Sequence, residues 1–316
     1  MKRTKTLIPE IRTKINNFLK QKELTLQSNT IEQIFLDDTR HCFFAPVLKN
    51  KQLYFLKIRT HQEDRELSRF AKQYALGMFL KQNYSLIIAK YTPKLIEGSF
   101  NRKDQLDYLL YEYIENTNTG SRSEYGICNL TETDLEHIVK IIIGFLAVSI
   151  NRLPKNLPKQ QSSFYREKMI YHHLESQYQD LIKQINWPKF DQNNQFFSHG
   201  DFGPHNFGHT KNGLIYSDFD DASITNPYFD VATLWVYAFL HQEWRQELIK
   251  RFKQNIKGQF VFDQEYLFIN MLVYTLVQIG FLLRHPKEIV DLYLKRRHQD
   301  LNMLASQLGI KVNLFK

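Results

Sequence analysis

Residues 196–221 place acidic and amide side chains at short intervals between apolar runs. Asp201 is followed five positions later by Asn206, and Asp218 comes directly after the segment LIYS. Carboxylate and amide oxygens suit Mg²⁺, an ion that takes one or two protein groups and completes its shell with water and phosphate oxygens. Asn206 and Asp218 fit that role, which leaves Asp201 to accept the proton of an attacking hydroxyl or to orient it. The set therefore indicates phosphoryl transfer.

Short extended runs flank these residues and are expected to bring them together. The runs QFF at 195–197 and LIYSDF at 214–219 have the composition of strands. The second strand would deliver Asp218 at its end. Lys57 has a similar place, near the end of the apolar run LYFLKI at 53–58.

The periodicity of apolar residues divides the chain into a sheet-rich part and a helical part. It predicts helices over 8–22 and 63–82, strands within 30–58 with KNK as a turn, and a hairpin over 93–114. From about residue 130 it predicts helices over 131–153, 162–186, 227–257, 263–283 and 286–308. The fold class is therefore α+β, with an N-terminal lobe over 1–115, a C-terminal lobe over 116–316 and the segment YEYIENTNTG as the hinge.

The positive charge of the chain is concentrated at its ends. The formal net charge is +9, of which residues 1–24 contribute +5 and residues 284–316 contribute +4. The interior is neutral, so the charge indicates solvated termini rather than a surface for nucleic acid. No nucleic-acid partner is expected.

The cysteine content and the longest apolar stretches favour a cytoplasmic protein. There are only two cysteines, Cys42 and Cys128, and neither has the spacing of a metal site or a disulfide framework. The apolar runs IIIGFLAVSI and MLVYTLVQIGFLL are shorter than a bilayer requires, and no signal-peptide core follows the basic N-terminus. We therefore expect a cytoplasmic location and no membrane span.

The quoted motifs resemble those of the phosphotransferase enzyme family, which includes aminoglycoside phosphotransferases and choline kinases. The resemblance lies in HGDFGPHNF, IYSDFDDA and NPYFDVATL. It implies a protein-kinase-like two-lobe fold, with Asp201 as the catalytic residue and Asn206 and Asp218 as Mg²⁺ ligands. It also implies that Asp230 braces the catalytic loop from the start of a helix.

The N-terminal part resembles a kinase-like nucleotide site with one departure. Lys57 matches the lysine that contacts the nucleotide phosphates. The run YLLYEYIE resembles the hinge strand, and its backbone from Glu112 to Ile114 would pair with adenine. No glycine precedes Gly77, so the glycine-rich phosphate loop of protein kinases is absent.

The carboxylate that would orient Lys57 is not unique in the sequence. The helix after its strand offers Glu63, Glu66 and Gln73. Family spacing favours position 73, but a glutamine cannot neutralise a lysine. Glu63 lies close to the strand end, so Glu66 is the predicted partner.

Three other polar residues near the motif have structural alternatives. His199 is expected to brace the loop rather than to act as an acid or base. Asp220 is either a second metal contact or an ordinary loop acid, and Asp221 is more readily a loop acid.

The sequence therefore predicts a Mg²⁺-dependent kinase that moves the γ-phosphoryl group of ATP or GTP to a hydroxyl of a small molecule such as an amino sugar, amino alcohol or sugar. The alternative is a non-catalytic nucleotide-binding regulatory protein of the same fold. A protein kinase is less consistent, because no Ala-Pro-Glu segment with an activation loop follows Asp218. The residues decide neither the acceptor nor the oligomeric state. Aromatics such as Trp187, Trp235, Tyr237 and Trp244 are candidates for a cage around an ammonium group, with a core role as the alternative.

Overall fold

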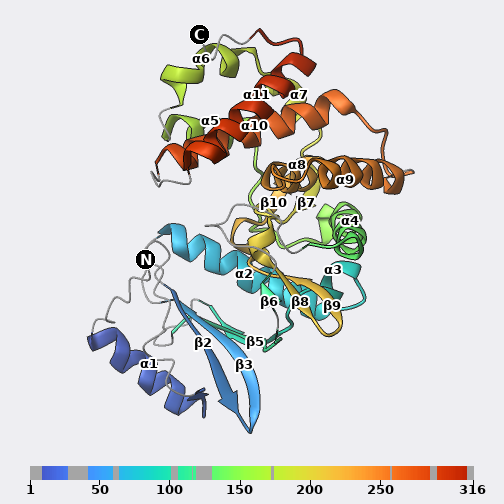
Figure 1. Ribbon diagram of the computed structural model, residues 1–316. Helices are drawn as coiled ribbons and strands as arrows, with labels where there is room; N and C mark the ends of the chain where they lie inside the picture. Colours follow the sequence, from blue (N-terminus) through green and yellow to red (C-terminus); the bar gives the residue numbers. More distant parts are fainter. Residues whose placement is uncertain are drawn as a thin grey trace. The chain divides into compact units, whose positions relative to one another are not determined.

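The computed structural model describes residues 9–27, 42–59, 64–100, 106–115, 117–118, 130–171, 174–256, 258–284 and 290–311 (Figure 1). Contacts within the chain define two compact units, and each is described by itself. The N-terminal unit comprises Met1–Asn116, Pro154–Asn156 and Ser217–Asp220, and the C-terminal unit comprises Thr117–Leu153, Leu157–Tyr216 and Asp221–Lys316.

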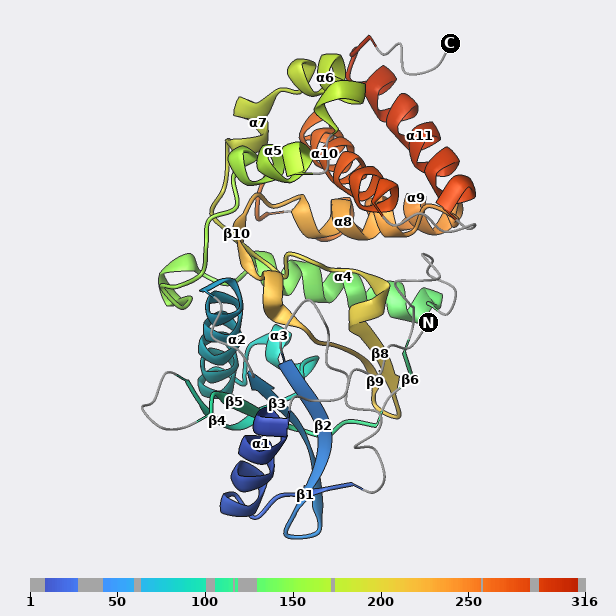
Figure 2. The ribbon, with the colours of Figure 1, turned by 90° about the vertical axis from the view of Figure 1, so that its left-hand side faces the viewer.

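The N-terminal unit is built on an antiparallel five-stranded sheet in the order β1-β2-β3-β5-β4 (Figure 2). The prediction of a sheet-rich N-terminal part is confirmed. Its elements are α1 (Pro9–Gln21), β1 (Thr25–Leu26), β2 (Cys42–Lys49), β3 (Gln52–Arg59), α2 (Asp64–Gln82), α3 (Ile87–Lys90), β4 (Leu95–Ser99) and β5 (Tyr108–Glu112).

The turn between β2 and β3 lies within the predicted KNK segment. Asn50 and Lys51 both have positive φ angles, 51° and 65°. Left-handed backbone at both central residues is what a two-residue hairpin turn requires, since its twist then matches that of the strands. The hairpin fixes a register in which Lys57 pairs with Phe44 of β2.

Alternation along β3 places Lys57 on one particular face of the sheet. Leu56 and Ile58 belong to the core cluster that includes Phe18 of α1. Successive side chains of a strand point to opposite faces. Lys57 therefore lies on the other face, together with Leu109, its partner on β5. Leu109 packs in a second cluster with Phe70 of α2, so Lys57 is on the α2 side of the sheet.

The C-terminal unit is mainly helical and contains two small sheets, one pairing β10 with β7 and the other ordered β6-β8-β9. Its elements are β6 (Thr117–Asn118), α4 (Glu132–Leu146), η2 (Ile150–Arg152), α5 (Ser162–Tyr171), α6 (Glu175–Gln184), α7 (Trp187–Asp191), β7 (Phe196–Ser198), η3 (Pro204–Asn206), β8 (Phe207–Thr210), β9 (Gly213–Tyr216), β10 (Ser223–Thr225), α8 (Phe229–Tyr237), α9 (Gln242–Asn255), α10 (Gln264–Leu283) and α11 (Val290–Gln307). The short helix η4 (Phe219–Asp221) begins in the N-terminal unit and ends in this one.

Two of the predicted helices are each broken in the structure. The predicted segment 162–186 forms α5 and α6, and the segment 227–257 forms α8 and α9. Every residue of α8 is buried, whereas α9 buries only Arg245, Leu248 and Phe252. A helix that is buried on all sides lies in the core, and an amphipathic helix lies at the surface. The chain therefore turns between α8 and α9.

Helix α10 passes through the core of the C-terminal unit. It is the one helix among the described residues that is long and apolar enough to cross a membrane. The expectation that every apolar stretch is too short was therefore wrong for this one, because the helix begins seven residues before the run MLVYTLVQIGFLL and reaches 20 residues. Of its most apolar stretch, 83% is buried inside the structure, which is typical of a core helix.

A buried ion pair links α9 to α11 and also holds the end of α8. The guanidinium of Arg245 donates to both carboxylate oxygens of Asp300, at 2.8 and 2.7 Å. Its Nε donates to the carbonyl of Trp235 at 2.8 Å. The side chains of Arg245 and Asp300 are only 1% and 8% exposed. Loss of either partner would leave an uncompensated buried charge.

We predict that Asp300→Ala lowers the free energy of unfolding by about 3–5 kcal/mol, the usual cost of removing one partner of a buried ion pair. Urea unfolding followed by tryptophan fluorescence measures the change. Glu136→Ala is the matched control, because Glu136 pairs with Lys140 on the exposed face of α4 and surface pairs contribute little. Equal destabilisation by the two substitutions would contradict the assignment.

Candidate active site

The loop that carries Asp201 connects β7 to β8, and we call residues 198–206 the Asp201 loop. Its backbone closes on itself, since Gly203 N–H donates to Asp201 O and Asn206 N–H donates to Gly203 O, both at 2.9 Å. The side-chain amide of Asn206 also donates to Asp201 O, at 2.8 Å. Because the amide nitrogen is used in this way, the acceptor that Asn206 can offer a ligand is its oxygen.

The Asp201 carboxylate contacts two side chains that the sequence analysis did not assign to it. Its Oδ2 lies 3.0 Å from Nε2 of His205, and its Oδ1 accepts a hydrogen bond from the hydroxyl of Tyr237 at 3.0 Å. The Asp201 side chain is 13% exposed. The contact with His205 follows from close spacing in the sequence, whereas Tyr237 comes from α8, where only the tertiary fold brings it near.

Asp230 lies in the first turn of α8 and binds the beginning of the Asp201 loop. Its carboxylate accepts hydrogen bonds from the hydroxyl of Ser198 at 2.8 Å and from the backbone N–H groups of His199 and Gly200 at 3.1 and 3.4 Å. Burial raises the pKa of Asp230 to about 7, these hydrogen bonds oppose the increase, and the charge of Asp201 adds to it. Asp230 therefore holds the loop at the cost of burying a carboxyl group.

Gly200 allows the loop to turn sharply between His199, whose N–H binds Asp230, and Asp201. Its φ angle is +83°, and a Cβ atom at this position would lie 1.9 Å from the carbonyl oxygen of Asp221. Both the backbone conformation and the close approach exclude other residues. The glycine of the HGD motif is thus a geometric requirement of this loop.

His199 is fully buried beneath the loop. Its ring packs against Phe202 and Tyr216, with centroids 5.7 Å away in each case, and against Phe145 at 6.4 Å. A histidine enclosed by aromatic rings has the surroundings of a structural residue.

In the N-terminal unit, Lys57 pairs with Asp220. The Nζ of Lys57 donates to Oδ1 of Asp220 at 3.1 Å, and the two side chains are 7% and 5% exposed. The ammonium also lies 5.2 Å from the centre of the Phe44 ring. The side chain of Glu66, the predicted partner, lies outside the described residues, so that choice stays a prediction.

Asp218 also has a hydrogen-bond partner in this unit, on α2. The side-chain amide of Gln73 donates to Oδ1 of Asp218 at 3.3 Å, and Gln73 is only 5% exposed. The backbone of Asp218 is left-handed, with φ at +70°. Burial raises the pKa of Tyr111, and the negative charges of Asp220 and Asp218 add to the increase. The two carboxylates, the lysine and the glutamine thus form a compact polar cluster on the α2 side of the sheet.

The residues of the predicted hinge strand lie at the end of β5. Glu112 pairs with Tyr54 of β3, and its backbone N–H donates to the carbonyl of Lys94 at 2.9 Å. Its carboxylate accepts from the backbone N–H of Lys94, also at 2.9 Å. The Glu112 N–H is therefore used within the fold. Adenine pairing by the backbone from Glu112 to Ile114 stays a prediction, and it would not use the Glu112 N–H.

The described residues contain no group of three or more histidine, cysteine, aspartate or glutamate side chains that could hold a metal ion. A Mg²⁺ site does not need such a group, because Mg²⁺ takes only one or two protein ligands and keeps water in its shell. The carboxylate of Asp218 and the amide oxygen of Asn206 are ligands of the kind that it prefers.

Two of the four candidates for an aromatic cage, Trp235 and Tyr237, have other contacts. The face of the Trp235 ring is covered by the guanidinium of Arg245 at 3.7 Å. The indole N–H of Trp187 donates to the carbonyl of Ile182, and the hydroxyl of Tyr237 binds Asp201. Trp235 therefore has the core role that was the alternative, and Tyr237 contacts Asp201. Trp187 and Trp244 are half-buried, and a cage role for them stays a hypothesis.

Comparison with known proteins identifies the family. The model of the phosphotransferase enzyme family matches residues 47–264, and no curated protein matches the chain in sequence. Among solved structures, the GDP and kanamycin complex of APH(2")-IIia has a TM-score of 0.61 at 12% identity, over 93% of this chain and 98% of that chain. Choline kinase LicA from Streptococcus pneumoniae has a TM-score of 0.58 at 12% identity, over 94% and 99%. A thermostable mutant of the aminoglycoside phosphotransferase APH(4)-Ia with ADP and hygromycin B has a TM-score of 0.52 at 10% identity, over 93% and 96%.

These matches confirm two predictions from the sequence. The family model covers more than half of the chain, which confirms the resemblance. The structural similarity confirms the α+β, protein-kinase-like fold class.

We predict that Asp230 makes stability depend on pH. Burial raises the pKa of its carboxyl from the ordinary value of 3.8 to about 7 in the folded protein, so between these values the folded state binds more protons than the unfolded state. The free energy of unfolding therefore falls as pH rises from about 4 to about 7, by up to about 4 kcal/mol. Asp230→Asn lacks this titration.

Thermal unfolding of wild type and Asp230→Asn at several pH values measures the effect. The stability of the wild type relative to the variant is expected to decrease steadily across this window. A difference that stays constant with pH would show that Asp230 is ionised throughout.

Proposed function

The chain belongs to the phosphotransferase enzyme family and is a small-molecule phosphotransferase, and from this premise we propose that it moves the γ-phosphoryl group of ATP to a hydroxyl of its acceptor in a Mg²⁺-dependent reaction. Asp201 is the catalytic residue. Its carboxylate accepts the proton of the attacking hydroxyl, or orients that hydroxyl toward the phosphorus. The bond that forms joins the acceptor oxygen to the γ-phosphorus, and ADP leaves.

The observation that carries the proposal is the fixed geometry of Asp201. Its backbone carbonyl is bound by Asn206, and its carboxylate is held by Tyr237 and lies beside His205. Asp230 holds the backbone just before it. A catalytic group held in one orientation lowers the entropic cost of reaching the transition state, which is how this fold is expected to work, since phosphoryl transfer needs positioning more than covalent chemistry.

We assign the nucleotide-binding roles to the polar cluster of the N-terminal unit. Lys57 contacts the phosphates, and Asp220 holds its ammonium group in place. Asp218 and Asn206 are the Mg²⁺ ligands, and Gln73 keeps the Asp218 carboxylate oriented. The ion, when bound, would neutralise the charge of the phosphate oxygens. The backbone from Glu112 to Ile114 is assigned to adenine.

For the nucleotide we propose one of two candidates, and for the acceptor we propose a class of molecules. The similar structures contain GDP or ADP, so we propose ATP as donor with GTP as the competing choice. The same two structures also contain kanamycin and hygromycin B, and another similar structure is a choline kinase. An amino sugar, an amino alcohol or a related sugar is the acceptor class that we propose, and a cytoplasmic location stays a prediction from the sequence.

The alternative function, a regulator that binds nucleotide without transferring phosphate, makes a different prediction about Asp201. A binding protein needs no positioned base. Its nucleotide affinity would depend on Lys57 and Asp218, and substitution of Asp201 would change nothing that can be measured.

We predict that Asp201→Asn lowers the rate of ADP formation by about 10²- to 10⁴-fold, the range for loss of a positioned acid or base. ATP affinity is expected to stay within about twofold, because a hydrogen-bonding side chain of the same size remains. Initial rates with kanamycin, hygromycin B and choline as acceptors, together with calorimetric titration of ATP, measure both quantities. Asp180→Asn, on the exposed side of α6, is the matched control. A near-normal rate in Asp201→Asn would assign the base elsewhere.

We predict that Asp218→Ala removes the Mg²⁺-dependent part of ATP binding, since Asp218 is the one carboxylate to which we assign the metal. ATP is expected to raise the thermal midpoint of the wild type in Mg²⁺ and to have little effect in EDTA. The variant should show the small effect under both conditions. Equal stabilisation of wild type and variant in Mg²⁺ would contradict the assignment.

A further inference from the structure

Helix α8 reaches the Asp201 loop from both of its ends. Asp230, in its first turn, holds the backbone of His199 and Gly200. Tyr237, its last residue, holds the Asp201 carboxylate. The two residues are seven positions apart, close to two full turns, so their side chains leave the same face of the helix.

The hydroxyl of Tyr237 is oriented by a second tyrosine. Tyr274 of α10 donates its hydroxyl to the hydroxyl of Tyr237 at 3.3 Å. Burial raises the pKa of Tyr274 well above its ordinary value, and the negative charge of Asp201 raises it further. Tyr274 therefore remains protonated and donates, which leaves the proton of Tyr237 directed at Oδ1 of Asp201.

The ring of Tyr237 packs directly against the Asp201 loop. A Cβ atom at Gly203 would lie 2.7 Å from Cε2 of Tyr237, so the loop backbone packs directly against the ring. The ring of His205 lies 5.3 Å away, edge to face. Tyr237 is only 8% exposed. Its hydroxyl is therefore fixed by packing as well as by hydrogen bonds.

Two buried arginines hold the end of α8 where Tyr237 lies. Arg245 donates to the carbonyl of Trp235 at 2.8 Å, and Arg297 donates to the carbonyl of Val236. Cations at the C-terminus of a helix also interact favourably with its dipole. The position of Tyr237 thus depends on contacts that are independent of the loop.

We propose that Tyr237, supported by Tyr274, is a positioning residue for phosphoryl transfer: it fixes the rotamer of the Asp201 carboxylate through Oδ1, so that the carboxylate is aimed at the acceptor hydroxyl before the acceptor binds. The inference rests on the proposed function. It adds a requirement that the family motif does not contain, namely a hydroxyl at the last residue of α8. Neither tyrosine is assigned a contact with nucleotide or acceptor.

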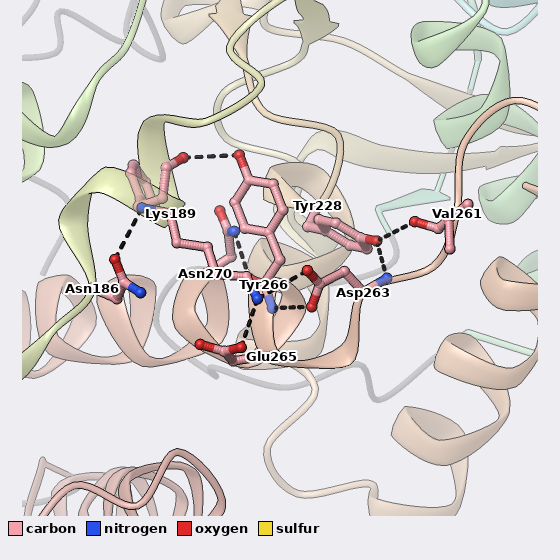
Figure 3. Close-up of polar contacts among 9 residues, drawn as sticks. Asn186, Lys189, Tyr228, Val261, Asp263, Glu265, Tyr266 and Asn270 are labelled. Atoms are coloured by element: carbon pink, nitrogen blue, oxygen red, sulfur yellow. Dashed lines mark hydrogen bonds and ion pairs between the residues drawn. The ribbon is translucent and has the colours of Figure 1, made fainter.

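The test compares Tyr237→Phe with Tyr266→Phe. Tyr266 is a buried tyrosine of α10 whose hydroxyl donates to the carbonyl of Phe190 at 2.9 Å, in a cluster with Lys189, Asp263 and Asn270 (Figure 3). Each substitution removes the hydroxyl of one buried tyrosine from the same unit. Tyr237→Phe removes the hydrogen bond to Asp201 and the one from Tyr274, whereas the hydroxyl of Tyr266 donates to Phe190 rather than to Asp201.

ADP formation is measured at varied Mg²⁺–ATP, with water as acceptor and with kanamycin, hygromycin B and choline. Tyr237→Phe is expected to lower kcat about 10-fold, as for loss of a hydrogen bond to a charged group, with the KM for ATP within about twofold. Tyr266→Phe should lower the thermal midpoint without changing kcat. A kcat for Tyr237→Phe equal to that of Tyr266→Phe would overturn the inference. Loss of activity in Asp201→Asn beside full activity in Tyr237→Phe would overturn this inference alone, whereas full activity in both would overturn the proposed function.

A double-mutant cycle tests the role of Tyr274. If Tyr274 acts only by orienting Tyr237, Tyr274→Phe lowers kcat about twofold to threefold in the wild type and has no further effect in Tyr237→Phe. Independent, additive losses would show that Tyr274 does not act through Tyr237.

Discussion

The contact between the buried carboxylate of Asp230 and the Asp201 loop is the interaction on which the geometry of the site depends. A buried carboxyl group is costly unless it is hydrogen-bonded. Here the hydroxyl of Ser198 and two backbone N–H groups bind it. Those donors can converge on one carboxylate only if the chain turns sharply at Gly200, and this turn places Asp201 at the start of the next segment. The three hydrogen bonds offset part of the cost of burial and at the same time hold the loop to α8.

Helix α8 holds both the backbone of the Asp201 loop and the carboxylate of Asp201. Every residue of α8 is buried, so the helix cannot shift without disturbing the core. Its first turn supplies Asp230, and its last residue supplies Tyr237. The pair Arg245–Asp300 holds the carbonyl end of the helix. The position of Asp201 therefore depends on α8, which the hydrophobic core holds in place.

The sequence predicted what depends on local pattern and motif. Alternation predicted the β2–β3 hairpin, and the spacing of Asp201, Asn206 and Asp218 predicted the candidate site. Contacts between distant segments carry no such pattern. Nothing in the sequence indicates that Tyr237 of α8 binds Asp201 or that Lys57 lies beside Asp220, because both depend on how helices and strands pack. For Gln73, the sequence showed only that the side chain cannot neutralise Lys57, and packing revealed that it binds Asp218 instead.

The central claim is that this chain transfers a phosphoryl group to a hydroxyl and does not merely bind nucleotide. The most direct test is phosphorus NMR of a reaction containing the protein, Mg²⁺–ATP and each of kanamycin, hygromycin B and choline. The account predicts, for at least one acceptor, a new phosphate monoester resonance that grows in step with ADP. ADP accompanied only by inorganic phosphate, or no ADP with any acceptor, would contradict it.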